Sequence, residues 1–326
     1  MYPWATASWE SLLARRENLP QALLIHGPRG IGKLELARTF AQLVLCETAG
    51  AREPCGECDG CRWFAAGQHP DFRQVEPEAL AAPVEPSEDA PAPSKTTKPS
   101  QEIKVDQVRE LAGFLNIGSH RGKRRLAVFH PAEAMNANAA NSLLKSLEDP
   151  ASGACFILVS NNARHLIPTI RSRCISVPMG IPDTAASLAW LKQQAVENAA
   201  DWLAFAGGAP LLAMEYAGSE RGERIAQLAD LLRKGGRAGL ADWSATEREH
   251  IELLSEVLQK WALDQAFSGF CGKTKYFPPG GPGKRPSGTP DAWLRFAREA
   301  GRYRSASRHP LNPKLFAMDL VSRMPG

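Results

Sequence analysis

The sequence predicts an α/β protein with a doubly wound, mostly parallel sheet, followed by a helical C-terminal region. A glycine-rich loop joins an apolar run to an amphipathic stretch within residues 22–45. Further apolar runs then alternate with helical patterns as far as residue 177, which is typical of a parallel sheet. Beyond residue 182 the patterns are helical. A chain of 326 residues has room for two or three domains.

Composition narrows the class of protein. A hydrophobic content of 44% is enough for packed cores, and a formal charge of +4 from 39 basic and 35 acidic residues does not by itself indicate nucleic-acid binding. We find no apolar stretch long enough to cross a bilayer, and the N-terminus lacks the basic and apolar regions of a signal peptide. We therefore expect a cytoplasmic protein without a membrane partner.

The first elements are an amphipathic helix at residues 5–17, a buried strand at Ala22–His26 and a glycine-rich loop. The loop at 27–34 reads G-x-x-x-x-G-K-L and leads into a helix with apolar residues at helical spacing. Its candidate phosphate-binding residues are Gly27, Gly30, Gly32 and Lys33.

The loop departs from a working P-loop at one position. A P-loop carries Ser or Thr after the lysine, because that hydroxyl ligates Mg²⁺, and here the residue is Leu34. The phosphate-binding loop is therefore degenerate. Weak binding of ATP or phosphate stays open beside a glycine-rich turn without a ligand, and hydrolysis of Mg²⁺-ATP is not expected.

Four of the seven cysteines lie close together with the spacing C-x8-C-x2-C-x2-C. They are Cys46, Cys55, Cys58 and Cys61. This spacing indicates a tetrahedral Cys₄ zinc site in a reducing compartment, and a set of four protein ligands makes the zinc structural. An iron–sulfur cluster uses the same ligands and stays open, as do four unrelated thiols.

The rest of the first domain alternates strands and helices. Strands are expected at residues 71–75, 124–130, 155–160 and 174–177, and helices at 103–115, at about 139–148 and at 167–173. Residues 79–98 are rich in Ala, Pro, Ser, Glu and Thr, and we expect a disordered insertion there. The basic run at 123–125 is interpreted as a solvated face, with DNA contact as the lesser alternative.

Pro and Gly residues at 178–182 mark the first domain boundary. We expect a core domain at 1–178, a small helical domain at 179–217 and a second helical domain at 218–326. Helices of the last domain are expected at 221–235, 244–268 and about 290–305.

Two further motifs complete a recognisable set. Asn141 to Pro150 read N-S-L-L-K-S-L-E-D-P, and Ser172-Arg173-Cys174 follow. A P-loop, an inserted cysteine cluster and these two motifs in this order resemble the clamp-loader branch of the AAA+ ATPases. The resemblance covers residues 1 to about 215.

The resemblance implies a Rossmann-like AAA+ core, a helical lid at 179–217 and a helical collar at 218–326. It implies a five-subunit ring with the gamma/tau motor subunits and the delta subunit of DNA polymerase III. That ring opens the sliding clamp and places it on primed DNA, within the DNA-directed DNA polymerase holoenzyme at the nucleoid. It also implies that Arg173 acts in trans as an arginine finger at a neighbouring subunit's ATP site. The alternative for Arg173 is a structural arginine paired with a local carboxylate.

The same resemblance indicates a subunit that does not hydrolyse ATP. In the family's motors, two acidic residues end the strand before the N-x-L-L-K helix, and the matching residues here are His130 and Pro131. Glu133 is displaced by two positions, and Pro210 occupies the place of a phosphate-sensing lid arginine. An active motor subunit is the first alternative, and a zinc-dependent DNA-binding protein is the second.

Overall fold

The computed structural model describes residues 1–48, 50–81, 99–116, 124–240, 243, 248–277, 288–307 and 312–325. The chain forms two compact units, Met1–Ile181 and Pro182–Gly326. The boundary falls in the Pro/Gly segment at 178–182. The division of the second part at residue 217 into lid and collar stays a prediction.

The first unit contains a five-stranded sheet in which every strand pair is parallel. The strands are β1 (Ala22–His26), β2 (Phe72–Val75), β3 (Arg125–Phe129), β4 (Ala154–Ser160) and β5 (Ile175–Pro178), in the order β2-β3-β4-β1-β5. All residues of β3 and β4 are buried, which explains why these strands read as continuous apolar runs. The prediction of a parallel α/β sheet is confirmed.

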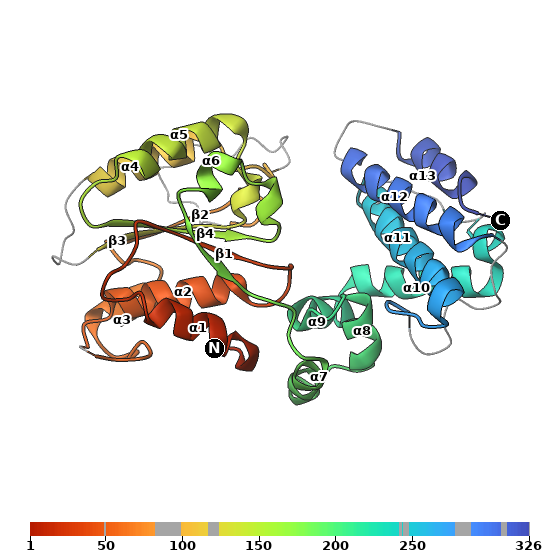
Figure 1. The fold of residues 1–326 in the computed structure, drawn as a ribbon, viewed down its shortest axis with the longest axis horizontal. Coiled ribbons are helices and arrows are strands. Elements are labelled where there is room, and N and C mark those ends of the chain that lie inside the picture. Colours follow the sequence, from red (N-terminus) through yellow and green to blue (C-terminus); the bar gives the residue numbers. More distant parts are fainter. Residues whose placement is uncertain are drawn as a thin grey trace, which may run out of the picture. The chain divides into compact units, whose positions relative to one another are not determined.

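Helices cover both faces of this sheet (Figure 1). One face carries α4 (Val105–Asn116), α5 (Ala137–Glu148) and α6 (Pro168–Arg171), and the other carries α1 (Thr6–Leu13), α2 (Lys33–Leu45) and α3 (Asp59–Ala65). Single 3₁₀ turns, η1 (Pro3–Ala5), η2 (Ala132–Ala134) and η3 (Ala163–His165), precede α1 and follow β3 and β4. Apolar side chains of α4 and α5 pack with β1, β3 and β4 into one buried cluster.

The basic run at 123–125 is not a solvated face throughout. Arg125 in β3 is buried, and its Nε lies 3.2 Å from Oδ1 of the buried Asp71. Lys123 lies outside the described residues. A buried, paired arginine cannot contact DNA phosphate, so the expectation was wrong at Arg125.

The predicted insertion at 79–98 lies mostly outside the described residues, which stop at Ala81 and resume at residue 99. The N–H of Ala79 donates to the carbonyl of Ser100 at 3.0 Å, so the two ends of this segment lie side by side.

The second unit is helical in its described residues. It contains α7 (Thr184–Gln193), α8 (Ala199–Phe205), α9 (Pro210–Ala217), α10 (Glu220–Gly239), α11 (Arg248–Cys271), α12 (Pro290–Ala306) and α13 (Pro313–Ser322). The three long predicted helices correspond to α10, α11 and α12, and α10 kinks at Gly236. No described helix of the chain is long and apolar enough to span a bilayer.

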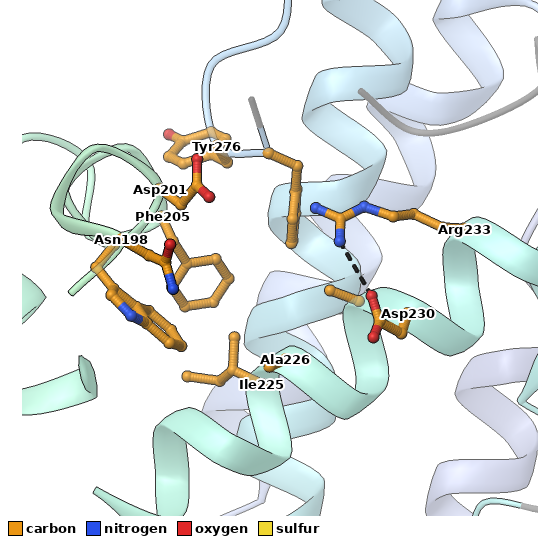
Figure 2. Close-up of a pocket in the computed structure, with 11 residues that line it drawn as sticks. Asn198, Asp201, Phe205, Ile225, Ala226, Asp230, Arg233 and Tyr276 are labelled. Carbon is orange, nitrogen blue, oxygen red and sulfur yellow. Dashed lines mark hydrogen bonds and ion pairs between the residues drawn. The ribbon is translucent and has the colours of Figure 1, made fainter. Parts of the chain in front are cut away.

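A cavity of about 170 Å³ lies in the second unit (Figure 2). Its walls come from α8, α10 and the segment after α11, and include the aromatic rings of Trp202, Phe205, Tyr276 and Phe277. At its rim Arg233 pairs with Asp230 at 3.1 Å. No sequence pattern predicted this cavity.

Candidate functional site

The glycine-rich loop joins the carboxyl end of β1 to the first turn of α2. Gly30 and Gly32 have φ angles of +79° and +88°, which residues other than glycine rarely adopt. Gly32 is the N-cap of α2, and the N–H of Leu36 donates to its carbonyl at 3.0 Å. A Cβ at Gly27 would lie 2.0 Å from the carbonyl oxygen of Met179. The backbone therefore needs glycine at these positions whether or not a ligand binds.

Two aromatic residues near the N-terminus pack on this loop. Nε1 of Trp4 donates to the carbonyl of Ile31 at 2.8 Å, and the rings of Tyr2 and Trp4 stack with centroids 5.1 Å apart. A Cβ at Gly32 would lie 2.3 Å from the ring of Tyr2. These contacts support the loop conformation from within the chain.

Lys33 is the one buried cation of the loop, with 4% of its surface exposed. Its ammonium donates to the carbonyl of Pro28 and, at 2.9 Å, to Oδ1 of Asn161, which follows β4. Burial lowers the pKa of Lys33 to about 8, although the charge of Glu133 opposes this shift. A buried ammonium at a helix N-terminus can bind an anion once it leaves these acceptors.

Glu133 lies near the loop, where its charge acts on Lys33. Its Oε1 accepts from the N–H of Asn161 at 2.9 Å, while Oε2 is buried without a hydrogen-bond partner among the described residues. The 3₁₀ turn η2 carries Glu133 back toward Asn161 and Lys33. Although Glu133 lies two positions beyond the expected one in the sequence, its carboxylate is therefore still close to the loop.

The other expected positions offer no magnesium ligand. Leu34 lies in the first turn of α2, and His130 and Pro131 follow β3. Burial, together with the charge of Lys33, lowers the pKa of His130, so this ring is neutral at pH 7. Pro210 begins α9 in the second unit. The hydroxyl and both adjacent carboxylates of a working Mg²⁺-ATP site are absent from these positions.

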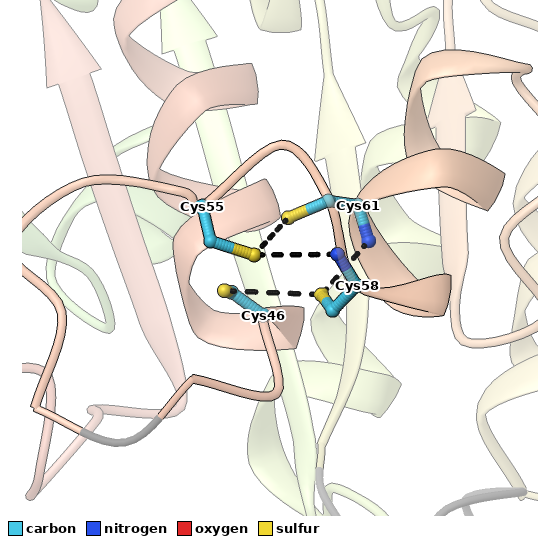
Figure 3. Close-up of side chains that lie close together, drawn as sticks. All are labelled: Cys46, Cys55, Cys58 and Cys61. Carbon is cyan, nitrogen blue, oxygen red and sulfur yellow. Dashed lines mark hydrogen bonds between the residues drawn. The ribbon is translucent and has the colours of Figure 1, made fainter.

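The four clustered cysteines converge on one point (Figure 3). Cys46 is the C-cap of α2, Cys58 is the N-cap of α3, Cys61 lies in the first turn of α3, and Cys55 lies in the loop between the two helices. All four Sγ atoms lie within 4.8 Å of one another. The Sγ atoms are 3.9 Å apart for Cys55 and Cys61, and 4.0 Å apart for Cys58 and Cys46.

These separations match a single tetrahedral ion. Bonds of about 2.3 Å to zinc place the sulfurs of a tetrahedron about 3.8 Å apart. A cluster of several iron atoms separates the sulfurs further, because the cluster core lies between them. The cysteine geometry therefore favours one metal ion over an iron–sulfur cluster.

Backbone N–H groups surround the sulfurs and can stabilise thiolates. The N–H of Cys58 donates to Sγ of Cys55 at 3.4 Å, and the N–H of Cys61 donates to Sγ of Cys58 at 3.4 Å. A hydrogen bond with Thr48, followed by backbone donors, lowers the pKa of Cys55 to about 6, whereas burial raises the pKa of the Cys61 thiol to about 12. A bound cation would favour the thiolate form of both.

Arg173 lies on an exposed but well-anchored turn after α6. Its neighbours are fixed, because Ile170 is fully buried and Cys174 packs against the core cluster. The Arg173 side chain is 36% exposed, and its Nη2 lies 2.7 Å from Oε1 of Glu148 at the end of α5. Nη1 donates to the carbonyl of Thr169 at 3.0 Å.

Comparison with known proteins supports one family. Residues 6–181 match the family model described as DNA polymerase III, delta subunit. The chain belongs to this family. The match covers all the strands of the first unit, and it includes the glycine-rich loop, the four cysteines and Arg173.

Curated members of the family agree. The chain is 39% identical to the DNA polymerase III subunit delta' of Pseudomonas aeruginosa, over 72% of this chain and 66% of that protein. It is 31% identical to the subunit delta' of Yersinia pestis, over 59% of this chain and 52% of that protein. The chain thus matches between about half and two-thirds of the length of these relatives.

Among solved structures, a DNA polymerase III gamma subunit-related protein from Thermotoga maritima is similar at 16% identity. The likeness covers 97% of both chains with a TM-score of 0.49.

Two residues of these sites, Asn161 and Glu148, were not predicted as site residues from the sequence. Asn161 accepts from the ammonium of Lys33, and its N–H donates to Glu133, whereas Glu148 pairs with Arg173. Asn161 had a usable signal, since polar residues at the carboxyl ends of parallel strands beside a glycine-rich loop are typical site residues. Glu133 was noted from the sequence as a displaced carboxylate, but the turn that directs it toward Lys33 is not visible in a hydrophobic pattern.

Proposed function

We propose that this chain is a non-hydrolysing subunit of the DNA polymerase III clamp loader that supplies Arg173 in trans to a neighbouring ATP site. Its partners are then the gamma/tau motor subunits and delta in a five-subunit ring, acting on the sliding clamp and primed DNA. Membership of the DNA polymerase III delta subunit family supports the complex. The setting is the cytoplasm, at the nucleoid.

The proposal rests on a contrast between the glycine-rich loop and the turn that carries Arg173. The chain's own loop has Leu34 where a magnesium ligand is needed, while the guanidinium of Arg173 reaches the surface from an anchored turn. A guanidinium supplied from another subunit stabilises the charge that spreads over a transferring phosphoryl group. Arg173 pairs with the local carboxylate of Glu148, but it lies at the surface of a subunit without a working site of its own, where it can supply this chemistry to a neighbour.

The test is ATP hydrolysis by a reconstituted loader with clamp and primed DNA, comparing this chain with its Arg173→Ala variant. Loss of an arginine finger costs about 10³-fold or more at the site that it serves, so total turnover should fall by that site's share. Arg171→Ala is the matched control, because Arg171 is also exposed and ends the helix α6 that precedes Arg173. Unchanged turnover by Arg173→Ala in an assembled loader would show that this arginine is structural.

We further propose that Cys46, Cys55, Cys58 and Cys61 hold a structural zinc ion. Elemental mass spectrometry of the purified chain should find about one zinc per chain. Cys58→Ser should lose it, and Cys271→Ser should keep it, because Cys271 is exposed and lies outside the cluster. Iron in place of zinc, or no metal at all, would reject the assignment.

Gly27, Gly30, Gly32 and Lys33 are proposed as a weak phosphate site without hydrolysis. The buried ammonium and the helix N-terminus support anion binding, whereas the carboxylate of Glu133 beside them opposes a terminal phosphate. We propose the lid and collar roles for 179–217 and 218–326 on the resemblance alone.

One observation favours the motor alternative, namely the carboxylate of Glu133 near Lys33. A motor subunit would hydrolyse ATP by itself, and Glu133→Gln would abolish that hydrolysis. We expect no hydrolysis by the isolated chain, because Leu34 leaves the metal without its hydroxyl ligand.

A further inference from the structure

The guanidinium of Arg173 is held from two sides by its own chain. Nη2 faces Oε1 of Glu148 at 2.7 Å, and Nη1 faces the carbonyl of Thr169 at 3.0 Å. Each of the two terminal nitrogens thus has one acceptor. A planar group fixed at both terminal nitrogens has a defined plane and direction, which a free surface arginine lacks.

The carboxylate that holds Arg173 is itself well placed. Glu148 is the last residue of α5, and α5 is anchored in the core by Leu143 and Leu147. Glu148 accepts from Arg173 through one oxygen, and its side chain is 55% exposed. The pair therefore joins the end of α5 to the turn after α6 at the surface of the unit.

We propose that Glu148 is a positioning residue that aims the guanidinium of Arg173 at the neighbouring subunit's nucleotide. This inference rests on the proposed trans role of Arg173. Its physical basis is preorganisation, because a side chain already held in its working direction loses less conformational freedom in the transition state. The guanidinium has five N–H donors, so the two internal contacts leave donors for phosphate oxygens.

The expected effect is moderate, because the pair is exposed to solvent. In the reconstituted loader, Glu148→Ala should lower the kcat of ATP hydrolysis by about two- to fivefold, the range that an exposed ion pair can contribute. The KM for ATP should not change, because the neighbouring subunit binds the nucleotide. Glu148→Gln keeps an oxygen acceptor and should retain more activity than Glu148→Ala. Glu10→Ala breaks the exposed pair with Arg52 and should leave turnover unchanged.

The double variant Glu148→Ala/Arg173→Ala decides between positioning and a general structural role. If Glu148 acts only through Arg173, the double variant should match Arg173→Ala alone. A further loss in the double variant, or wild-type or higher turnover by Glu148→Ala while Arg173→Ala is impaired, overturns the inference. If Arg173→Ala itself has no effect, the trans role fails first and the positioning role falls with it.

Discussion

At the scale of single residues, the charge of Lys33 connects the folding and the ligand binding of the loop. Burial lowers its pKa to about 8, whereas the unfolded chain keeps the ordinary value of 10.5. The unfolded state therefore binds more protons than the folded state between these values, and this lysine makes stability rise with pH across that window. A bound phosphate has the opposite preference, because it favours the protonated lysine.

This opposition predicts a pH dependence for ligand binding. ATP binding to the isolated chain, measured by calorimetry without Mg²⁺, should weaken above about pH 8 and approach a tenfold loss per pH unit. Lys33→Ala should bind more weakly at pH 7 and should lose this dependence. Binding that stays constant from pH 7.5 to 9.5 would show that Lys33 does not contact the phosphates.

At the scale of elements, one buried carboxylate joins the helices of the second unit. Glu256 on α11 accepts from the hydroxyl of Tyr216 on α9 at 3.0 Å, and it pairs with Arg221, Lys260 and Arg304. Burial alone would raise the pKa of Glu256, but Lys260, then Arg304 and Arg221, lower it to about 2. The network joins α9, α10, α11 and α12, on both sides of the predicted division at residue 217.

Removing this carboxylate should destabilise the second unit. Glu256→Gln leaves three cations around a neutral amide, and loss of one partner from a buried ion pair costs about 3 kcal/mol or more. In the wild type this stabilisation is complete above the ordinary pKa of 4.5 and is lost as pH falls toward about 2. Urea unfolding at pH 7 and pH 3 measures both effects, and Glu249→Gln, an exposed carboxylate on α11, is the control. An equal cost for both variants at pH 7 would contradict the role of the network.

The strands and helices also differ in how well a sequence pattern predicts them. Strands β3 and β4 were predicted because both faces are buried, and long helices such as α11 were predicted from their periodicity. Two short helices were missed for different reasons. In α3 the residues Asp59, Gly60 and Cys61 are poor helix formers, and the helix follows the N-cap Cys58 rather than any propensity. Helix α13 had a readable signal, because Asn312 caps it and Pro313 opens it.

The residues of the candidate sites also differ in how readily a sequence pattern predicts them. Residues set by local spacing, such as the four cysteines, could be predicted, and the structure brings their sulfurs together. Partners supplied by a distant strand or helix were missed, such as Asn161 for Lys33 and Glu148 for Arg173, because each pairing depends on the sheet order and on the ends of other elements. A local pattern thus finds the reactive group more readily than the group that orients it.

At the scale of the whole molecule, the chain combines two units that depend on different chemistry. Residues 1–181 contain the sheet, the cysteine cluster and the match to the delta subunit family, whereas residues 182–326 contain the Glu256 network. Each unit buries its own apolar residues. Loss of the cysteine cluster's metal should therefore destabilise the first unit, and loss of the Glu256 network should destabilise the second.

Calorimetric unfolding of the intact chain tests this separation. Removal of the proposed zinc with a chelator should destabilise the unit at 1–181, because metal binding contributes directly to folding free energy. Glu256→Gln should lower the transition of the unit at 182–326, and the two treatments together should shift both transitions additively. Cys271→Ser with and without chelator controls for thiol chemistry outside the cluster. A single transition that responds to both treatments would mean that the units unfold as one cooperative body. In that case loss of the metal would also weaken the helical unit, and the cysteine cluster would stabilise the whole subunit rather than its first half.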